Sequence, residues 1–225
     1  MGGFLKNPKK PVLIILGGFK VTDKIELLLN MINIADEIII GGGMSNPFLR
    51  KLGGYQLGST EIHMPEDPNA LKNIMEKARA KDVKIHLPVD GVCAQSYSPT
   101  APTITCDNAD VPEGWEIFDK GPKTVEIFGK AIERAHSIFW NGPIGVFEFP
   151  NFSSGSDGVL KKVIEATKDG ATSVIGGGDT ASLVRNRGFV NDVSYVSTGG
   201  GASLEFMQGM KLPGVESLSE ASELK

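Results

Sequence analysis

Six short runs of apolar, mostly β-branched residues recur along the chain and predict six buried strands. They span residues 12–16, 37–40, 84–87, 138–140, 172–175 and 193–197. Most of the runs are continuous rather than alternating, which is typical of strands that helices cover on both faces. Between them apolar residues recur at helical spacing. This periodicity predicts helices over residues 21–31, 69–81, 123–135, 158–168 and 179–186.

The alternation of strands and helices predicts an α/β fold. We expect a doubly wound, Rossmann-like parallel sheet of six strands, with helices on both faces. Residues 89–119 interrupt the alternation because they are rich in Pro, Ser, Thr and Asp, and they predict a small antiparallel excursion with a loop. No shift in composition marks a domain boundary. The sequence therefore predicts a single domain over residues 1–225, with residues 213–225 as an acidic tail.

The charge balance is mildly acidic. Lys and Arg number 23 and Asp and Glu 27, so the formal net charge at pH 7 is −4. This disfavours a nucleic-acid partner, because a phosphate backbone is usually met by a basic surface, whereas a nucleotide needs only a few local Lys and N–H groups. No apolar run approaches the roughly 18 residues that span a bilayer, so we expect a cytoplasmic protein without a membrane partner. Cys93 and Cys106 are expected to be free thiols.

At five points an apolar run ends in a cluster of glycines. The clusters begin at Gly17, Gly41, Gly142, Gly176 and Gly199. In open α/β sheets, ligands bind beyond the carboxyl ends of the strands, and a glycine turn before a helix lets N–H groups approach an anion. One such turn is equally well explained as an ordinary βα loop. Five at one edge of one sheet predict a polyphosphate ligand such as a nucleotide.

Charged residues beside these turns are candidates for the chemistry of the site. Lys20 and Lys24 lie four apart at a predicted helix start, where the helix dipole disfavours positive charge. They suggest phosphate neutralisation, or else an exposed solvated pair. Asp179 follows three glycines, so it either caps its helix or holds Mg²⁺ together with phosphate oxygens and waters. Glu148 either accepts hydrogen bonds from ribose hydroxyls or is an ordinary loop carboxylate.

Two familiar nucleotide signatures give a negative and a weak result. The P-loop pattern G-x-x-x-x-G-K-[ST] is absent. A dinucleotide pattern occurs from Gly176 to Ala181, but it requires an acidic residue about 20 positions on, at the end of the next strand. That strand ends at Ser197 and Thr198, without a carboxylate. A dehydrogenase is therefore disfavoured.

Taken together, the turns resemble one family, the phosphoglycerate kinases. The motifs occur in the family's order: LGGFKVTDK at 16–24, IIGGGM at 39–44, LPVD at 87–90, WNGPIGVFE at 140–148, GGGDTA at 176–181 and VSTGGGAS at 196–203. The resemblance runs from about residue 4 to residue 219 and covers only the carboxyl-terminal, nucleotide-binding half of the family. It implies that the chain is that half alone, with residues 1–10 as a remnant of the helix that joins the halves.

The resemblance also implies a role for each site residue. Those implied to bind the nucleotide are Gly17, Gly18, Phe19, Lys20, Lys24, Gly42, Gly121, Asn141, Pro143, Gly145, Glu148, Gly177, Gly178, Asp179 and Thr180. Within this set, Gly17, Gly18, Gly42, Gly121 and Gly145 would shape the adenine pocket. Catalytic roles are implied for Lys20, Lys24, Gly177 and Gly200. Asp179 would hold the Mg²⁺ that accompanies ADP or ATP.

The reaction implied by the family is phosphoryl exchange between ATP and 3-phosphoglycerate, giving ADP and 1,3-bisphosphoglycerate, as a step of glycolysis. Because 3-phosphoglycerate would be bound by a missing amino-terminal domain, the resemblance implies a monomeric chain that binds nucleotide with little or no catalysis. Three positions depart from the family's pattern: Phe19 stands where a small Ala is usual, and Asn46–Pro47 and Gly91 are also unusual. Phe19 favours the alternative, a non-catalytic nucleotide-binding or interaction module that keeps the fold.

Overall fold

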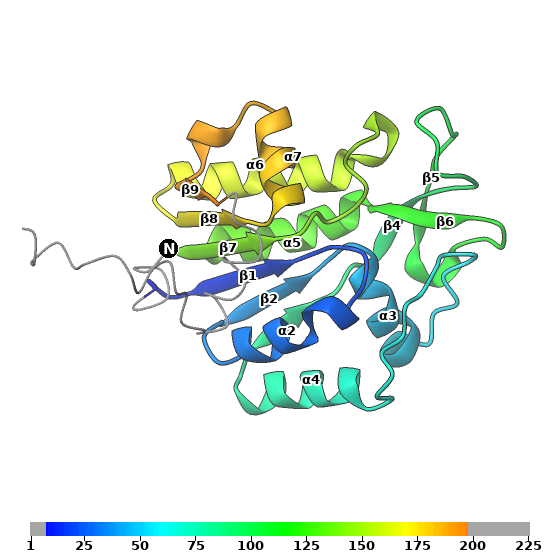
Figure 1. Ribbon diagram of the computed structural model, residues 1–225, viewed down its shortest axis with the longest axis horizontal. Helices are drawn as coiled ribbons and strands as arrows, with labels where there is room; N and C mark the ends of the chain where they lie inside the picture. The colour runs from blue at the N-terminus through cyan, green and yellow to red at the C-terminus, as the bar shows by residue number, and fades with distance from the viewer. Residues whose placement is uncertain (1–7, 198–225) are drawn as a thin grey trace, which may run out of the picture.

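The computed structural model describes residues 8–197 and is built on a six-stranded parallel sheet (Figure 1). Its order is β3-β2-β1-β7-β8-β9. The strands are β1 Val12–Leu16, β2 Glu37–Ile40, β3 Lys84–His86, β7 Ser137–Asn141, β8 Thr172–Gly176 and β9 Tyr195–Val196. All neighbouring strands pair in parallel. The chain moves outward from β1 to β3, then restarts beside β1 with β7. This order places the topological switch point between β1 and β7 and confirms the predicted fold class.

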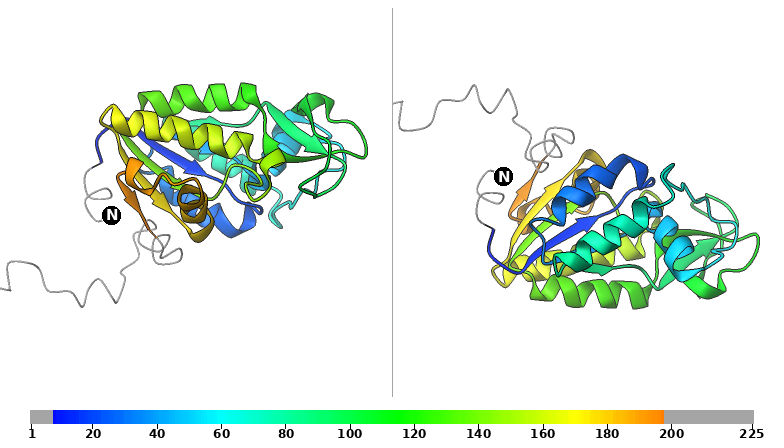
Figure 2. Two further views of the ribbon diagram at one scale, coloured as in Figure 1. Left: turned by 90° about the horizontal axis from the view of Figure 1, so that it is seen from above. Right: turned by 90° about the horizontal axis from the view of Figure 1, so that it is seen from below.

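Helices cover both faces of this sheet (Figure 2). Val12, Ile14 and Leu16 belong to one apolar core and Leu13 and Ile15 to the other, which explains why the whole β1 run is apolar. The first core packs under α2 Ile25–Met31, α3 Asn46–Gly53 and α4 Ala70–Ala80. The second packs under α5 Pro122–Arg134 and α6 Ser154–Lys168 and includes apolar residues of α7 Gly178–Asn186.

A small antiparallel sheet lies toward the carboxyl ends of the parallel strands (Figure 1). It consists of β4 Asp90–Ala94, β5 Ile104–Asp107 and β6 Glu116–Lys120 in the order β5-β4-β6, which confirms the predicted excursion. Gly91 lies in β4, where a Cβ would stand 2.7 Å from the Ile117 Cγ2 atom on the partner strand. The unusual glycine is therefore explained by close packing between strands.

Several predicted boundaries differ from the observed ones. The segment predicted as one helix over 21–31 is a 3₁₀ turn, Thr22–Lys24, followed by α2. Helix α3 was not predicted, because Asn46–Pro47 interrupts its apolar pattern, yet Pro is tolerated in a first helical turn. Helix α6 begins at Ser154, before the predicted start, and Gly155 in its first turn makes room for the Asp119 carboxylate.

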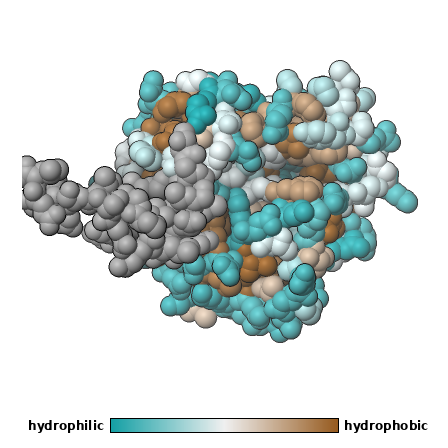
Figure 3. All heavy atoms as spheres, viewed as in Figure 1, coloured by the Kyte–Doolittle hydropathy of each residue, from teal (hydrophilic) through white to brown (hydrophobic). Residues whose placement is uncertain are grey.

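Some predictions concern residues outside 8–197. The Gly199 cluster with Gly200, the tail 213–225 and most of the proposed helix remnant 1–10 lie there. Within the described range, no helix is long and apolar enough to cross a membrane. The space-filling view of one face shows polar side chains interspersed with apolar patches (Figure 3).

Candidate functional site

A cleft of about 490 Å³ opens at the carboxyl ends of the parallel strands. The predicted site residues that line it are Gly18, Phe19, Gly42, Pro143, Gly145, Glu148 and Asp179. They come from the turns after β1, β2 and β7 and from the first turn of α7. A second groove of about 640 Å³, between α3, Met75 and Asp107, contains none of the predicted residues. The cleft is therefore the candidate site.

Three glycine turns interlock at the switch point. The Gly17 N–H donates to the Asn141 carbonyl oxygen at 2.9 Å, and the Gly18 N–H donates to the Pro143 carbonyl oxygen at 3.0 Å. A Cβ at Gly17 would overlap the Pro143 carbonyl, and a Cβ at Gly42 would overlap the Gly18 carbonyl. These N–H groups are thus used between the turns instead of facing a ligand. Their glycines are required because the backbones approach so closely.

Lys24 lies beneath these turns and holds them together. Its Nζ atom donates to the Gly17 carbonyl oxygen at 2.7 Å and to the Asn141 Oδ1 atom at 2.7 Å. Burial lowers the pKa of Lys24 to about 8, although the carboxylates of Asp179 and Asp23 act in the opposite direction. The site therefore contains an ammonium group whose charge its protein partners only partly stabilise. Neither lysine lines the cleft, but Lys20, unlike Lys24, is exposed.

The Asn141 side chain, at the end of β7, is 2% exposed. Its Nδ2 atom is buried without a hydrogen-bond partner among the described residues. It lies 3.0 Å from where a Cβ at Gly177 would stand, and Gly177 has a φ of 90°, so a glycine is required there. Thr180 accepts a hydrogen bond from the Gly142 N–H at 2.7 Å and so fixes the start of α7 against this turn.

Asp179 is exposed in the first turn of α7 and lines the cleft. Gly177 occupies the capping position of this helix, and no side chain caps it. The interpretation of Asp179 as an N-cap is therefore excluded. The first N–H groups of the helix have no intrahelical acceptor and belong to the same turn as the Asp179 carboxylate. No group of three or more His, Cys, Asp or Glu suited to a metal ion occurs within residues 8–197.

The opposite part of the cleft is apolar and aromatic. Phe19 is 57% exposed, and its ring centroid is 4.6 Å from that of His63 in an edge-on arrangement. Tyr97, also 57% exposed, lies 5.8 Å from Phe118, ring centroid to ring centroid. Glu148 lines the cleft as well, and its Oε2 atom accepts a hydrogen bond from the Phe147 N–H. This wall offers a surface on which a planar ring can stack.

Sequence reasoning missed the contribution of the small sheet and its neighbours. The lining residues that it did not identify include Asn46, Thr60, Glu61, Tyr97, Glu116, Ile117, Phe118 and Val146. Half of them, Tyr97, Glu116, Ile117 and Phe118, belong to residues 89–119, whose composition predicted an antiparallel excursion with a loop but no particular site residue. The one available signal was the presence of isolated aromatic residues in an otherwise polar stretch.

The structure places Gly121 away from the cleft. It precedes α5, and a Cβ there would overlap the Asp90 carboxylate. That carboxylate accepts hydrogen bonds from the N–H groups of Lys123 at 3.0 Å and Thr124 at 2.8 Å. Gly121 thus makes room for the residue that caps α5. Gly121 does not line the cleft, and its position in an adenine pocket stays a prediction.

Gly145 combines both kinds of role, because it lines the cleft and packs against Asp119. Asp119 is fully buried, and burial raises its pKa to about 7 against the opposing hydrogen bond from the Gly155 N–H. The side chain of Lys120 is buried beside it, and burial lowers the pKa of Lys120 to about 8. A Cβ at Gly145 would overlap the Asp119 carboxylate, so a glycine is required at this point of the cleft wall.

Comparison with known proteins gives a consistent result. The family model described as phosphoglycerate kinase matches residues 1–210. A phosphoglycerate kinase of Schistosoma mansoni is 47% identical over 218 residues, which are 96% of this chain and 52% of that protein. One of Thermosipho africanus is 46% identical over 220 residues, 97% of this chain and 54% of the relative. The chain thus spans about half the length of the relatives it matches.

Solved structures agree. The structure of phosphoglycerate kinase from Coxiella burnetii superposes with a TM-score of 0.89 at 39% identity, covering 96% of this chain and 54% of that one. The enzyme from Pyrococcus horikoshii gives a TM-score of 0.70 at 26% identity, covering 92% and 51%. In both cases the similarity again covers about half of the solved chain.

Proposed function

This chain belongs to the phosphoglycerate kinase family, and from that premise we propose that its cleft binds MgADP or MgATP for phosphoryl transfer. The reaction we propose for the whole protein exchanges a phosphoryl group between 1,3-bisphosphoglycerate and ADP. The nucleotide would be bound here and 3-phosphoglycerate by a further domain. The isolated chain would then turn over little, because domain closure excludes water from the reacting groups.

The observation that carries the proposal is the amide nitrogen of Asn141, which has no hydrogen-bond partner among residues 8–197. Its Nδ2 atom is buried beside the N-terminus of α7, and its Oδ1 atom accepts from Lys24. A buried donor without an acceptor costs roughly 1–3 kcal/mol. An anionic oxygen at this point would accept from that donor and from the first turn of α7, while Lys24 supplies positive charge nearby. A nucleotide phosphate satisfies all three requirements.

The residues present also fit Mg²⁺. Asp179 offers an exposed carboxylate that no helix cap uses, in the first turn of α7. Mg²⁺ bound with a nucleotide typically takes one or two protein carboxylates and completes its coordination with phosphate oxygens and waters. When bound, the ion neutralises charge on the phosphates. Asp179 would hold it, and Thr180 would keep α7 in register with the β7 turn through its bond to Gly142.

The remaining roles follow from position. The base would lie against Phe19 and Tyr97, and the Glu148 carboxylate would accept hydrogen bonds from the ribose hydroxyls. Lys24 would neutralise the phosphates. Phosphoryl transfer depends mainly on positioning and charge neutralisation, which is what these groups provide. For Lys20 and Gly200 we retain the proposal that they meet the phosphoryl group in transit, although Gly200 lies outside the described residues.

A second candidate is a non-catalytic module that keeps the fold. The observation that favours it is the ring of Phe19, which lies in the cleft itself and alters the space available to a base. Such a module would bind nucleotide without dependence on Mg²⁺ at Asp179. The two candidates therefore differ in how substitution of Asp179 affects binding.

Calorimetric titration of the chain with MgADP tests the proposal. We expect saturable binding that Asp179→Ala weakens strongly in Mg²⁺ but not in EDTA. Asp169→Ala, which removes an exposed carboxylate at the far end of α6, serves as the matched control. Absence of both heat and thermal stabilisation at millimolar MgADP would contradict the proposal. An Asp179→Ala variant with unchanged affinity in Mg²⁺ would favour the non-catalytic module.

A further inference from the structure

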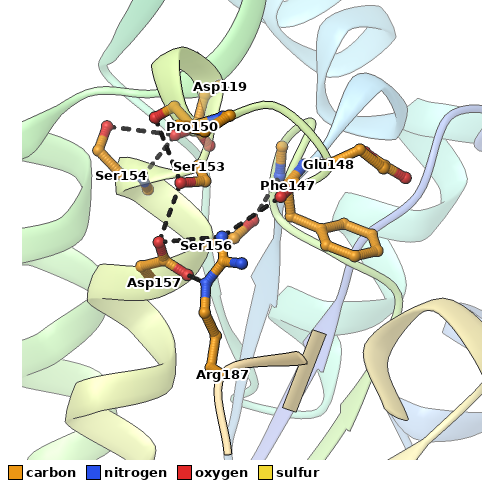
Figure 4. A network of polar contacts seen from close by, with 11 residues as sticks. Asp119, Phe147, Glu148, Pro150, Ser153, Ser154, Ser156, Asp157 and Arg187 are labelled. Atoms are coloured by element: carbon orange, nitrogen blue, oxygen red, sulfur yellow. Dashed lines mark hydrogen bonds and ion pairs between the residues drawn. The ribbon is translucent and has the colours of Figure 1, made fainter. Parts of the chain in front are cut away.

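A network of polar contacts joins the end of α7 to the loop that carries Glu148 (Figure 4). We propose that Arg187 is a positioning residue for this loop, and that through it Arg187 sets the affinity for the nucleoside part of the nucleotide. The inference rests on the proposed function of the cleft. It concerns a residue that has no contact with the cleft itself.

Arg187 directly follows α7 and makes a two-pronged contact with α6. Its Nε atom donates to the Asp157 Oδ1 atom at 2.8 Å, and its Nη2 atom to the Asp157 Oδ2 atom at 3.2 Å. Both side chains are about 30% exposed, at 31% and 29%. A guanidinium held at two points by one carboxylate has a fixed direction. This direction allows the third contact of Arg187.

The third contact reaches the loop. The Arg187 Nη2 atom also donates to the carbonyl oxygen of Phe147, at 3.3 Å. The Phe147 ring is buried in the core, so the residue is held by its side chain from one direction and by its carbonyl from another. Glu148 is the next residue and points away from the network (Figure 4). The placement of the Glu148 carboxylate thus depends on where Phe147 is fixed.

The first turn of α6 is the base on which this loop rests. The Gly145 N–H donates to Ser156 Oγ at 3.1 Å, and Ser153 Oγ donates to Asp157 Oδ2 at 2.9 Å. Asp157 is therefore shared between the loop's far end, at Ser153, and Arg187. Breaking the Arg187 contact removes one of the two restraints on Phe147, next to Glu148, and leaves the restraint at Gly145 in place.

Helix α7 consequently serves two parts of the cleft. At its start, Asp179 and Thr180 face the proposed phosphate site, and immediately after its end Arg187 holds the loop of the proposed ribose site. Leu183 and Val184 anchor the helix in the core between these points. Loss of the Arg187 side chain should therefore disturb the nucleoside part of the site and leave the phosphate part unchanged.

The test compares two ligands on the same chain, MgADP and magnesium pyrophosphate. We expect Arg187→Ala to weaken MgADP binding about tenfold, the scale of one misplaced hydrogen bond to a ligand, with magnesium pyrophosphate affinity unchanged. Arg187→Lys should give an intermediate loss, because an ammonium can pair with Asp157 but cannot form the fork. In a Glu148→Ala background, the effect of Arg187→Ala on MgADP should disappear.

Arg134→Ala is the matched control. Arg134 makes a similar two-point contact with Glu37, at 3.0 and 2.8 Å, remote from the cleft. We expect it to lower the melting temperature and leave both affinities unchanged. Three results would show that the positioning role is wrong. Arg187→Ala could bind MgADP as tightly as the wild type, or lose affinity equally for both ligands. It could also weaken MgADP binding to the same extent in the Glu148→Ala background. If the wild type itself does not bind MgADP, the proposed function fails first. Should Arg187→Ala not fold, the same outcomes are judged on Arg187→Lys.

Discussion

The two ends of the parallel sheet contain similar polar groups in opposite states. At the amino ends, Glu37 accepts hydrogen bonds from Arg134 and pairs with His86, and Asp36 accepts from Lys10 at 2.8 Å and from the Val12 N–H at 2.7 Å. At the carboxyl ends, the amide of Asn141 has a donor without a partner among residues 8–197, and the carboxylate of Asp179 caps no helix. Within this described range, the carboxylates named at the amino ends are paired, whereas the groups named at the carboxyl ends keep unused hydrogen-bonding capacity.

The pKa values express the same difference. Burial alone would raise the pKa of Glu37, but hydrogen bonds from Arg134 and His86 outweigh it and hold the pKa below its usual value. At Lys24 burial is the larger effect, and the nearby carboxylates do not restore the pKa, which falls to about 8. At Glu37 the opposite charges thus outweigh burial, whereas at Lys24 burial outweighs the nearby carboxylates.

The largest effect that we predict is at Lys24. Lys24→Met should weaken MgADP binding about 100-fold, because it removes a positive charge beside the proposed phosphate site. Calorimetric titration measures the change. Lys77→Met is the control, because Lys77 also donates to a backbone carbonyl, that of Leu29 at 2.8 Å, but belongs to α4 and has no bond to the glycine turns. Equal losses of MgADP affinity in Lys24→Met and Lys77→Met would contradict a specific role of the carboxyl ends of the strands in binding.

The second prediction concerns the amino ends of the strands, where a substitution should change stability and leave binding unchanged. Glu37→Ala should lower the free energy of unfolding by about 2 kcal/mol, between the values typical of exposed and fully buried pairs. The loss follows because Arg134 and His86 remain without their shared carboxylate. Urea unfolding measures the stability. Calorimetric titration measures the affinity for MgADP, which should not change. A parallel loss of MgADP binding would show that the amino end also supports the site.

The third prediction concerns pH. As pH rises through about 8, Lys24 loses its charge, so MgADP affinity should fall, by up to about tenfold per pH unit. Stability should move the other way. The folded pKa lies below the unfolded value, so the unfolded chain binds more protons between about 8 and 10.5, and the free energy of unfolding rises with pH there.

Burial also lowers the pKa of Lys120 to about 8, so both lysines contribute to the rise in stability. Lys24→Met should remove only the part of the rise in stability that Lys24 contributes. It should also abolish the fall in MgADP affinity that deprotonation of Lys24 causes. An affinity that stays constant from pH 7 to 9.5 would contradict the assignment of Lys24 as the charge that the phosphates meet.

The smallest predicted effect is at Phe19. Phe19→Ala should weaken MgADP binding about fivefold, near the low end for loss of one stacking aromatic ring, because the ring is more than half exposed. Binding of magnesium pyrophosphate should not change. The matched control is Tyr195→Ala, which removes an aromatic residue that is 50% exposed and does not line the cleft. Tighter MgADP binding in Phe19→Ala would instead show that the ring obstructs the base.

Much of this fold was predictable because local pattern and tertiary environment agree. The run Val12–Leu16 is apolar throughout since both of its faces are buried, and its boundaries matched the prediction. The site was predictable only in part. Gly121 and Gly177 both precede helices, yet one makes room for Asp90 and the other lies against Asn141. A sequence does not distinguish a glycine required by a buried carboxylate from one beside a ligand site.

The partners of Lys24 illustrate the same limit. Its proximity to the first glycine turn was evident, but its bond to Asn141 joins residues 117 positions apart. The aromatic wall was missed because Tyr97 and Phe118 come together through the small antiparallel sheet, whose pairing the periodicity of the chain did not reveal. These contacts depend on topology, and local pattern contains little information about it.

The interlocked turns have a consequence for how the chain folds. Gly17, Lys24 and Asn141 meet only when β7 pairs beside β1. The cleft therefore requires contacts between residues far apart in the sequence, and such contacts slow folding. Partly folded chains, in which only β1 to β3 have paired, contain no complete site. If the cleft binds nucleotide as proposed, the nucleotide would stabilise only the state in which β7 has paired beside β1, so the appearance of binding during refolding would report when that pairing occurs.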